Sequence, residues 1–156
     1  MSQLGRQVIV VLSTWFGCGR FPKGPGTAGT LGAIPLVWAF AQIGPMPYLV
    51  ATFLTTVIAM VVAQLYEDMI IQSHDAPEFV LDEVAGFLIT MAWIPLTPIY
   101  LIAGFVLFRV LDIWKPFPIS YLDRKVPGGI GTVADDLVAG IVANVILQFV
   151  FTRGLL

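Results

Sequence analysis

Residues 24–66 read GPGTAGTLGAIPLVWAFAQIGPMPYLVATFLTTVIAMVVAQLY, without a single charged side chain. A helix that crosses a bilayer needs about 17–25 mostly apolar residues, so this stretch is long enough for two crossings. Near its middle, residues 44–47 (GPMP) combine a glycine with two prolines, and both residue types interrupt helices. The stretch therefore predicts helices at about 28–43 and 48–67, joined by a tight hairpin.

Two further stretches, 84–108 and 137–152, also lack charged side chains. Pro95 and Pro98 interrupt the first of them, which leaves open either one long kinked helix or two short helices. Inside a helix each proline would remove a backbone donor and clash with a preceding carbonyl, at a high cost in hydrocarbon. We therefore expect a second hairpin, so that this part of the chain forms helices at about 81–94, 98–114 and 136–152.

The composition is typical of a membrane-embedded chain. Hydrophobic residues make up 58% and charged residues 12% of the 156 residues, with a formal charge of -2, whereas soluble domains have about 45–50% and about 25%. This balance excludes a disordered chain and argues against a nucleic-acid binder, which carries a basic face. The single cysteine, Cys18, allows no internal disulfide and has no sign of reactivity. We expect one all-α domain over residues 1–156, a compact multi-pass membrane helical bundle of about five inserted helices after a short N-terminal helix at Val8–Phe16.

Two hairpins would place the charged loops on one membrane face. Loops 17–27, 67–82 and 112–135, with the helix ends beside them, hold all 10 Asp and Glu residues, the one His and most of the Lys and Arg residues. The opposite face would keep Arg153, and Arg6 with it. Because loops rich in Lys and Arg stay on the cytoplasmic side, we expect the charged face to be cytoplasmic.

Two similar segments carry the carboxylates that suggest chemistry. DEVAG at 82–86 and DLVAG at 136–140 each place a Gly four residues after an Asp, on the same helical face, and small residues let helices approach closely. Glu83 follows the first Asp and Asp135 precedes the second. N-terminal capping explains one acid at a helix start, but four acids at two helix starts would repel one another unless a cation compensates them. Carboxylates of this kind suit Mg²⁺, which binds a few of them together with a substrate phosphate.

Residues 108–118, FRVLDIWKPFP, add a second charged group. Arg109, Asp112 and Lys115 are spaced by three and share a helix face. The conservative interpretation is an intrahelical ion pair with snorkelling cations. The functional one adds Asp112 to the carboxylate cluster and places both cations beside a phosphate.

Glycine-rich segments precede two of the predicted helices. FPKGPGTAGT at 21–30 opens into a helix and predicts a phosphate cradle, since glycines and a helix start present backbone N–H groups to an anion. It is not a Walker A loop. PGGIGT at 127–132 predicts a second glycine-rich loop before Asp135, which provides either flexibility or a second anion contact. His74, the only histidine, is most simply a surface residue, but beside an acidic site it would protonate a leaving group.

Taken together, these segments resemble the phosphatidylglycerophosphatase A family. The similarity covers roughly residues 16–142 in the family's order, through Pro25–Thr30, His74–Asp75, Asp82–Gly86, Phe108–Pro118, Asp123–Arg124, Gly128–Gly129 and Asp135–Gly140. It implies a Mg²⁺-dependent helical phosphatase of the bacterial inner membrane, with its active site facing the cytoplasm. Such enzymes act in phospholipid biosynthesis and hydrolyse the terminal phosphomonoester of the membrane lipid phosphatidylglycerophosphate to phosphatidylglycerol and phosphate.

From this resemblance and the residues above we assign expected roles. The metal ligands are Asp82, Glu83, Asp112, Asp135 and Asp136, and the catalytic residues are Asp82, Glu83, Asp112, Asp136 and His74. The substrate-binding residues are Lys23, Thr27, Thr30, Arg109, Lys115 and Arg124. We expect direct attack by water, because no nucleophile has a clear activating base. Two other classes stay open: an ion-coupled transporter, whose acids would lie near mid-helix, and a structural bundle that packs against a partner.

Overall fold

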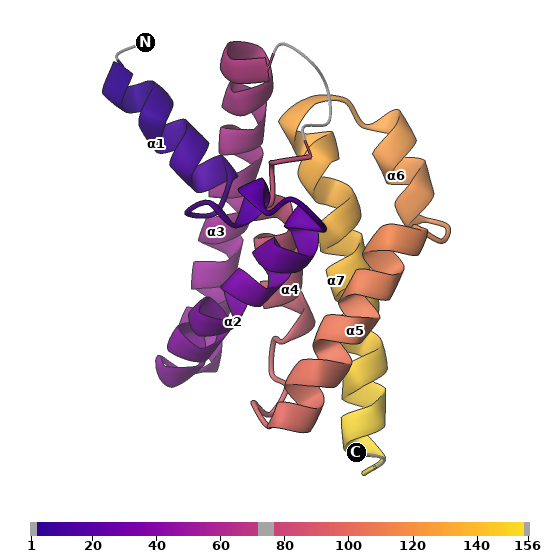
Figure 1. The fold of residues 1–156 in the computed structure, drawn as a ribbon. Helices are drawn as coiled ribbons and strands as arrows, with labels where there is room; N and C mark the ends of the chain where they lie inside the picture. Colours follow the sequence, from indigo (N-terminus) through magenta and orange to yellow (C-terminus); the bar gives the residue numbers. More distant parts are fainter. Residues whose placement is uncertain (1–2, 72–76, 155–156) are drawn as a thin grey trace.

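The computed structural model describes residues 3–71 and 77–154, and all regular elements in these ranges are helical (Figure 1). The predicted all-α class is therefore confirmed for the described residues, whereas the role predicted for His74 lies outside them. The α-helices are α1 (Gln3–Ser13), α2 (Pro25–Gln42), α3 (Pro45–Tyr66), α4 (Leu81–Thr90), α5 (Pro98–Trp114), α6 (Ile119–Lys125) and α7 (Gly128–Thr152). A 3₁₀ turn at Cys18–Arg20 precedes α2, and a π-helical turn at Glu67–Ile71 continues α3.

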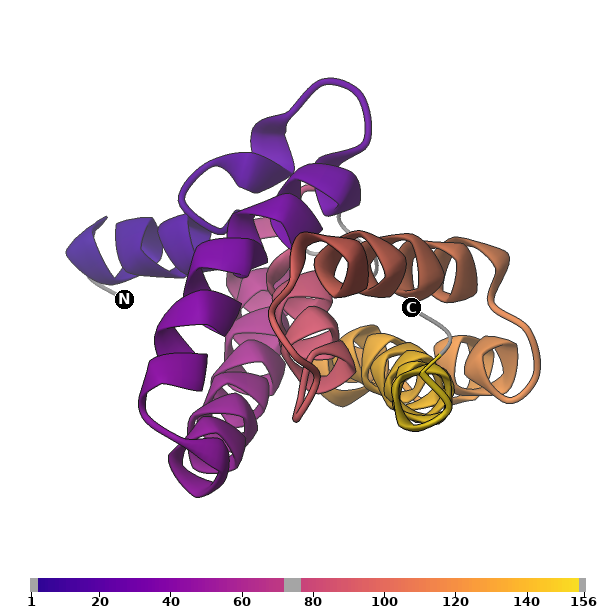
Figure 2. The same ribbon diagram turned by 90° about the horizontal axis from the view of Figure 1, so that it is seen from below.

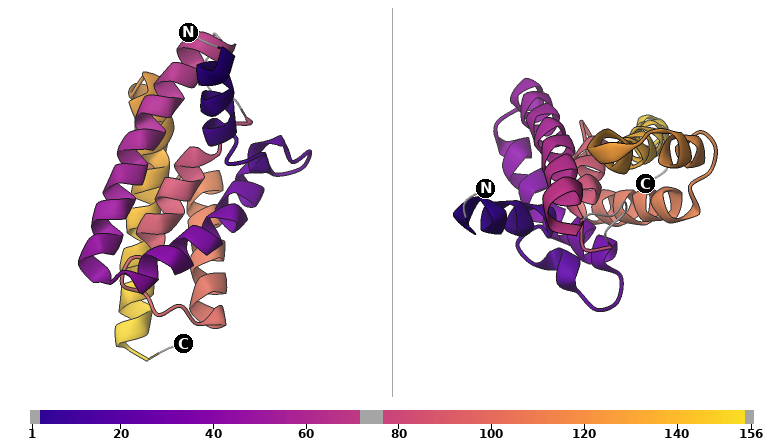
Figure 3. Two further views of the ribbon diagram at one scale, coloured as in Figure 1. Left: turned by 90° about the vertical axis from the view of Figure 1, so that its left-hand side faces the viewer. Right: turned by 90° about the horizontal axis from the view of Figure 1, so that it is seen from above.

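Helix α4 is short and central. It contacts α2, α3, α5 and α7, which surround it (Figures 2 and 3). Seven of its 10 residues are buried, including Phe87 and Leu88 at 0% exposure. A helix enclosed in this way is apolar on nearly all sides, which accounts for the run VAGFLIT that follows its two acids.

Side chains from α3 and α7 satisfy the backbone where α4 ends. The hydroxyl of Tyr48 donates to the Leu88 carbonyl at 2.7 Å. The amide of Asn144 donates to the carbonyls of Thr90 at 2.9 Å and Ala92 at 2.8 Å. Because the last carbonyls of a helix have no intrahelical partner and are costly to bury alone, these bonds allow α4 to end inside the bundle. The segment 84–108 is thus two helices, as expected, but the first ends at Thr90 rather than near 94.

Two glycines set the crossing of α4 and α7. A Cβ atom on Gly86 would lie 2.7 Å from the Asp136 carbonyl oxygen, and one on Gly140 would overlap the Gly86 carbonyl oxygen. The close approach predicted from DEVAG and DLVAG is present. Since each Gly lies one turn after an Asp, the same crossing brings Asp82 and Asp136 together.

The expected start of the last helix is wrong. Helix α7 begins at Gly128, not near 136, so PGGIGT is not a flexible loop but the entry and first turn of a 25-residue helix. Its glycines serve close packing, because a Cβ atom on Gly129 would overlap the backbone of Met60 and Gln64 in α3. Asp135 consequently lies about two turns inside the helix, where N-terminal capping cannot account for it.

Two other expectations need correction. Helix α6 forms within what was expected to be the loop 112–135. Arg6 does not lie with Arg153: it lines a groove together with Arg20, and the start of α1 lies at the same end of the bundle as the start of α7 (Figure 1). Eleven residues in α1 extend about 16 Å, too short to carry the chain across a bilayer.

Two helical segments, Pro45–Met69 and Gly128–Thr152, have the length and apolarity needed to cross a membrane. Large apolar side chains are exposed over the outside of the bundle, among them Trp38 at 63%, Phe53 at 66%, Ile102 at 64% and Val145 at 62% exposure. Helices α2 and α5 are shorter, with 18 and 17 residues.

Candidate active site

Three carboxylates meet where α4 crosses α7. Asp82 and Glu83 lie in the first turn of α4 and Asp136 lies in α7. One carboxylate oxygen from each can be chosen so that all three lie within 4.8 Å of one another. Asp136 is only 3% exposed. We call these three residues the acidic triad.

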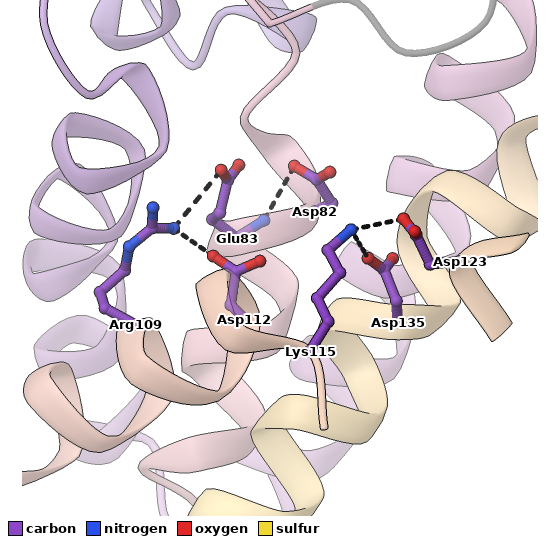
Figure 4. Close-up of polar contacts among 7 residues, drawn as sticks. All are labelled: Asp82, Glu83, Arg109, Asp112, Lys115, Asp123 and Asp135. Carbon is purple, nitrogen blue, oxygen red and sulfur yellow. Dashed lines mark hydrogen bonds and ion pairs between the residues drawn. The ribbon is translucent and has the colours of Figure 1, made fainter. Parts of the chain in front are cut away.

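Arginine and lysine side chains hold the other two predicted metal ligands beside the triad (Figure 4). Arg109 Nη1 lies 2.5 Å from Asp112 Oδ2 and 3.5 Å from Glu83 Oε1. Lys115 Nζ lies 2.7 Å from Asp135 Oδ2 and also contacts the Asp123 carboxylate. Asp112 and Asp135 are therefore neutralised by ion pairs, and the two cations expected to bind phosphate are already engaged by acids.

These contacts keep Lys115 charged. Burial alone would lower the pKa of its ammonium group, but the hydrogen bonds that it donates to Asp123 and Asp135, and the charges of these two carboxylates, raise it well above its usual range. Lys115 thus links α5 to both α6 and α7 across a wide range of pH.

The triad has the features of a cation site. Glu83 Oε2 is buried and has no hydrogen-bond partner among the described residues. Asp82 Oδ1 accepts only the backbone N–H of Glu83, at 2.9 Å, among the hydrogen bonds of residues 3–71 and 77–154. Of the three triad residues, Glu83 is the one that forms an ion pair with Arg109 among the described residues. Carboxylates that are buried or half-buried with so little compensation are costly, and an oxygen-only donor set suits a hard divalent cation.

A cavity of about 730 Å³ opens above the triad. Its walls come from the start of α2, the ends of α5 and α6 and the start of α7, and the wall residues include Gly24, Gly26, Arg109, Lys115, Arg124, Lys125, Gly128 and Thr132. A Cβ atom on Gly26 would overlap Glu83 Oε1 and lie 2.9 Å from Arg109 Nη1. Only glycine lets the start of α2 come this close to the acids.

Not all of the predicted substrate-binding residues line this cavity. Arg109, Lys115 and Arg124 do, whereas Lys23 and Thr27 are not among its lining residues. Thr30 is fully buried and its hydroxyl donates to the Gly26 carbonyl at 2.8 Å. The expected contact of Thr30 with substrate disagrees with this burial, because its hydroxyl completes an intrahelical bond instead.

Other residues that shape the cavity were not identified from the sequence. The Thr132 hydroxyl donates to Glu67 Oε1 at 2.6 Å, and Gln64 Oε1 accepts from the Gly129 N–H at 3.0 Å. These bonds hold the start of α7 against the end of α3. They join residues 65 positions apart, so no local pattern indicates them, whereas Lys125 could have been noticed as a second cation beside Arg124.

Fold and site together define a class of small helical proteins with a buried carboxylate cluster beneath a cation-lined cavity. Sequence comparison identifies the particular family: the model for phosphatidylglycerophosphatase A matches residues 11–151, and the chain belongs to this family. The resemblance inferred from the sequence segments is confirmed. No solved structure matches the chain.

Curated relatives agree with this assignment. Phosphatidylglycerophosphatase A of Escherichia coli is 39% identical over 142 residues, covering 90% of this chain and 81% of the relative. The protein of the same name from Haemophilus influenzae is 37% identical, covering 89% and 86%. A putative phosphatidylinositol-3-phosphatase of Bacteroides thetaiotaomicron is 32% identical, covering 88% and 90%.

Proposed function

We propose that this protein is a phosphatidylglycerophosphatase. It hydrolyses the terminal phosphomonoester of phosphatidylglycerophosphate, releasing phosphatidylglycerol and inorganic phosphate, as a step of phospholipid biosynthesis. The observation that carries the proposal is the acidic triad at the base of a cation-lined cavity, in a chain that belongs to a family of phosphatases.

Mg²⁺ is the proposed cofactor. Asp82, Glu83 and Asp136 would hold it. Asp112 and Asp135 would not bind the ion directly, because their carboxylates form ion pairs with Arg109 and Lys115. When bound, Mg²⁺ would neutralise phosphoryl oxygens and orient the attacking water. The partner-free Glu83 Oε2 supports this assignment because it is a buried acceptor with an unused lone pair.

The chain's own residues bind and orient the phosphoryl group. Arg109 lines the cavity, and a guanidinium group can donate charge-assisted hydrogen bonds to phosphoryl oxygens. Helix α2 begins at the cavity with Gly24 as its N-cap and no side-chain cap bond, so its first N–H groups are available to the same anion.

Water attacks the phosphorus directly in this mechanism. Of the described residues that line the cavity, the one that carries a hydroxyl group is Thr132, and this hydroxyl donates to Glu67. No histidine or cysteine is among these lining residues. The attacking water gives a proton to a carboxylate of the triad, the ester P–O bond to the glycerol oxygen breaks, and that oxygen takes up a proton from solvent to leave as an alcohol.

We infer a multi-pass membrane protein whose cavity faces the cytoplasm. The two apolar 25-residue segments cross the bilayer, with α2 and α5 completing the inserted bundle. The exposed apolar side chains support this placement, as do the side-chain bonds that satisfy the end of α4, because backbone groups in hydrocarbon need internal partners. The cavity, with most of the charged residues, lies toward one end and takes the headgroup while the acyl chains stay in the bilayer.

Two competing functions make different predictions. An ion-coupled transporter would have acids inside its helices, and Asp135 and Asp136 do lie two turns inside α7. The position of these acids therefore does not favour the phosphatase over the transporter, whereas family membership does. The relative named for phosphatidylinositol-3-phosphatase suggests that another lipid phosphomonoester is an alternative substrate.

One experiment separates these possibilities. The purified protein is given phosphatidylglycerophosphate, phosphatidylinositol 3-phosphate or phosphatidic acid in detergent micelles, and phosphate release is measured with Mg²⁺ or with EDTA. We expect release from phosphatidylglycerophosphate to be fastest and to stop with EDTA. Preference for the inositol lipid would change the substrate assignment, and no release from any lipid would refute the phosphatase.

A further inference from the structure

The cations of the cavity fall into two sets. Arg109 and Lys115 are ion-paired with acids around the triad. Arg124 and Lys125 also line the cavity, but within the described part of the chain neither has an ion pair. Both are exposed in the last turn of α6. Their charges are available to a ligand, whereas those of the first set are largely neutralised.

A chain of contacts connects the second set to the triad. Asp135 is the neighbour of Asp136 and binds Lys115, and Lys115 also binds Asp123 on α6 (Figure 4). Arg124 follows directly in the sequence. The end of α6 is thus fixed relative to the acids, and its unpaired cations directly follow the residue that binds Lys115.

Exposed aromatic side chains lie near these two cations in the sequence. Tyr121 is 56% exposed and lies three and four residues before Arg124 and Lys125, hence on the same helix face. Between α5 and α6, Phe117 is 83% exposed, and Trp114 at the end of α5 is 78% exposed. Aromatic residues in such positions are typical of a membrane–water interface. The unpaired cations and these aromatic residues thus lie on adjoining segments, α6 and the end of α5 with the loop that follows it.

We propose that Arg124 and Lys125 form a second anion subsite, which binds the phosphodiester of the lipid while the triad end of the cavity takes the terminal phosphomonoester. This inference rests on the proposed function. The substrate has two phosphates joined by glycerol, and the same cavity is lined by the triad with its paired cations and by two further cations without an ion pair among the described residues. Arginine supplies two parallel donors to phosphate oxygens and lysine a point charge. The acyl chains then leave past Phe117 and Tyr121.

The product and inorganic phosphate provide a two-sided test. Phosphatidylglycerol contains the phosphodiester without the monoester, and inorganic phosphate resembles only the monoester. In the double variant R124Q/K125Q, the KM for phosphatidylglycerophosphate and the Ki for phosphatidylglycerol should rise about tenfold, the effect of losing charge-assisted hydrogen bonds. The Ki for inorganic phosphate and kcat should stay near the wild-type values. Measurements in nonionic micelles at fixed ionic strength exclude competition from bulk anionic lipid.

Two control variants separate anion binding at this subsite from a general effect of the protein's net charge. R153Q removes a cation at the other end of the bundle (Figure 1) and should change none of the constants, whereas R124K/K125R keeps both charges and should restore most of the affinity. An unchanged Ki for phosphatidylglycerol in R124Q/K125Q, or an equal rise in both Ki values, would overturn the subsite. A wild-type protein that releases no phosphate from phosphatidylglycerophosphate would instead refute the proposed function, and this inference with it.

Discussion

The two segments DEVAG and DLVAG look alike in the sequence but differ in the structure. Both place a glycine at the crossing of α4 and α7, one turn after an aspartate of the triad. In the first segment the acids occupy the first turn of a 10-residue helix, and both belong to the triad. In the second segment the acids lie inside a 25-residue helix, and Asp135 forms an ion pair with Lys115 instead of belonging to the triad. The shared pattern therefore specifies the helix crossing, whereas the neighbours of each acid decide what it does.

The largest effect should come from the aspartates that the two segments share. Asp82→Asn and Asp136→Asn each remove a charge from the triad without changing side-chain size. We expect kcat to fall by about a thousandfold, at least as much as the loss of a preorganised electrostatic contact in an active site. Phosphate release at saturating Mg²⁺ measures the effect, and an unchanged thermal melt in detergent shows that the fold is intact. Near-normal turnover in either folded variant would remove that residue from the site.

The next prediction tests the crossing itself. In Gly140→Ala the new Cβ atom would overlap the Gly86 carbonyl oxygen, which is backbone and cannot move aside. We expect a loss of about 1–3 kcal/mol in the free energy of unfolding, together with reduced activity because Asp82 and Asp136 are moved apart. Thermal unfolding in detergent and phosphate release would be compared with wild type.

Gly104→Ala is the matched control for this variant. Its Cβ atom would lie 2.6 Å from the Met91 sulfur, and a flexible methionine can adjust to it. A gain in helix propensity partly offsets the remaining cost. Equal losses in the two variants would show that any added methyl group is harmful, and that the α4–α7 crossing has no special role.

A smaller loss should follow from changing the acid that distinguishes the second segment. Asp135→Asn removes one of the two carboxylates bound to Lys115 and leaves the Asp123 contact. Loss of a residue that orients a metal ligand without binding the metal typically lowers metal affinity or activity by about 10–100-fold. We therefore expect kcat to fall within that range, and by less than in Asp136→Asn. Kinetics as a function of Mg²⁺ concentration measure the difference. Equal losses at the two positions would make Asp135 a direct ligand, as the sequence alone suggested.

Helix class, the two hairpins and the meeting of α4 with α7 could be predicted because their signals are local. Charge-free stretches, prolines and glycine spacing act over a few residues. The start of α7 could not be predicted, since Gly128, Gly129 and Gly131 suggest a loop until the first two are seen packed against α3. Likewise, nothing near Lys115 in the sequence indicates that it binds Asp135, 20 positions away, rather than a phosphate.

The smallest effect on activity is expected at Thr30, where the local sequence pattern and the tertiary structure indicate different roles for the hydroxyl group. Its position in a glycine-rich segment suggests a phosphate contact, but its hydroxyl is buried against the Gly26 carbonyl. Thr30→Val keeps the shape and removes one hydrogen bond, so we expect a loss of about 0.5–1.5 kcal/mol in stability with KM and kcat near wild type. Because Gly26 lines the cavity and Thr30 does not, a large rise in KM in the folded variant would mean that the hydroxyl leaves its helix to reach substrate, and that the sequence pattern was the better guide.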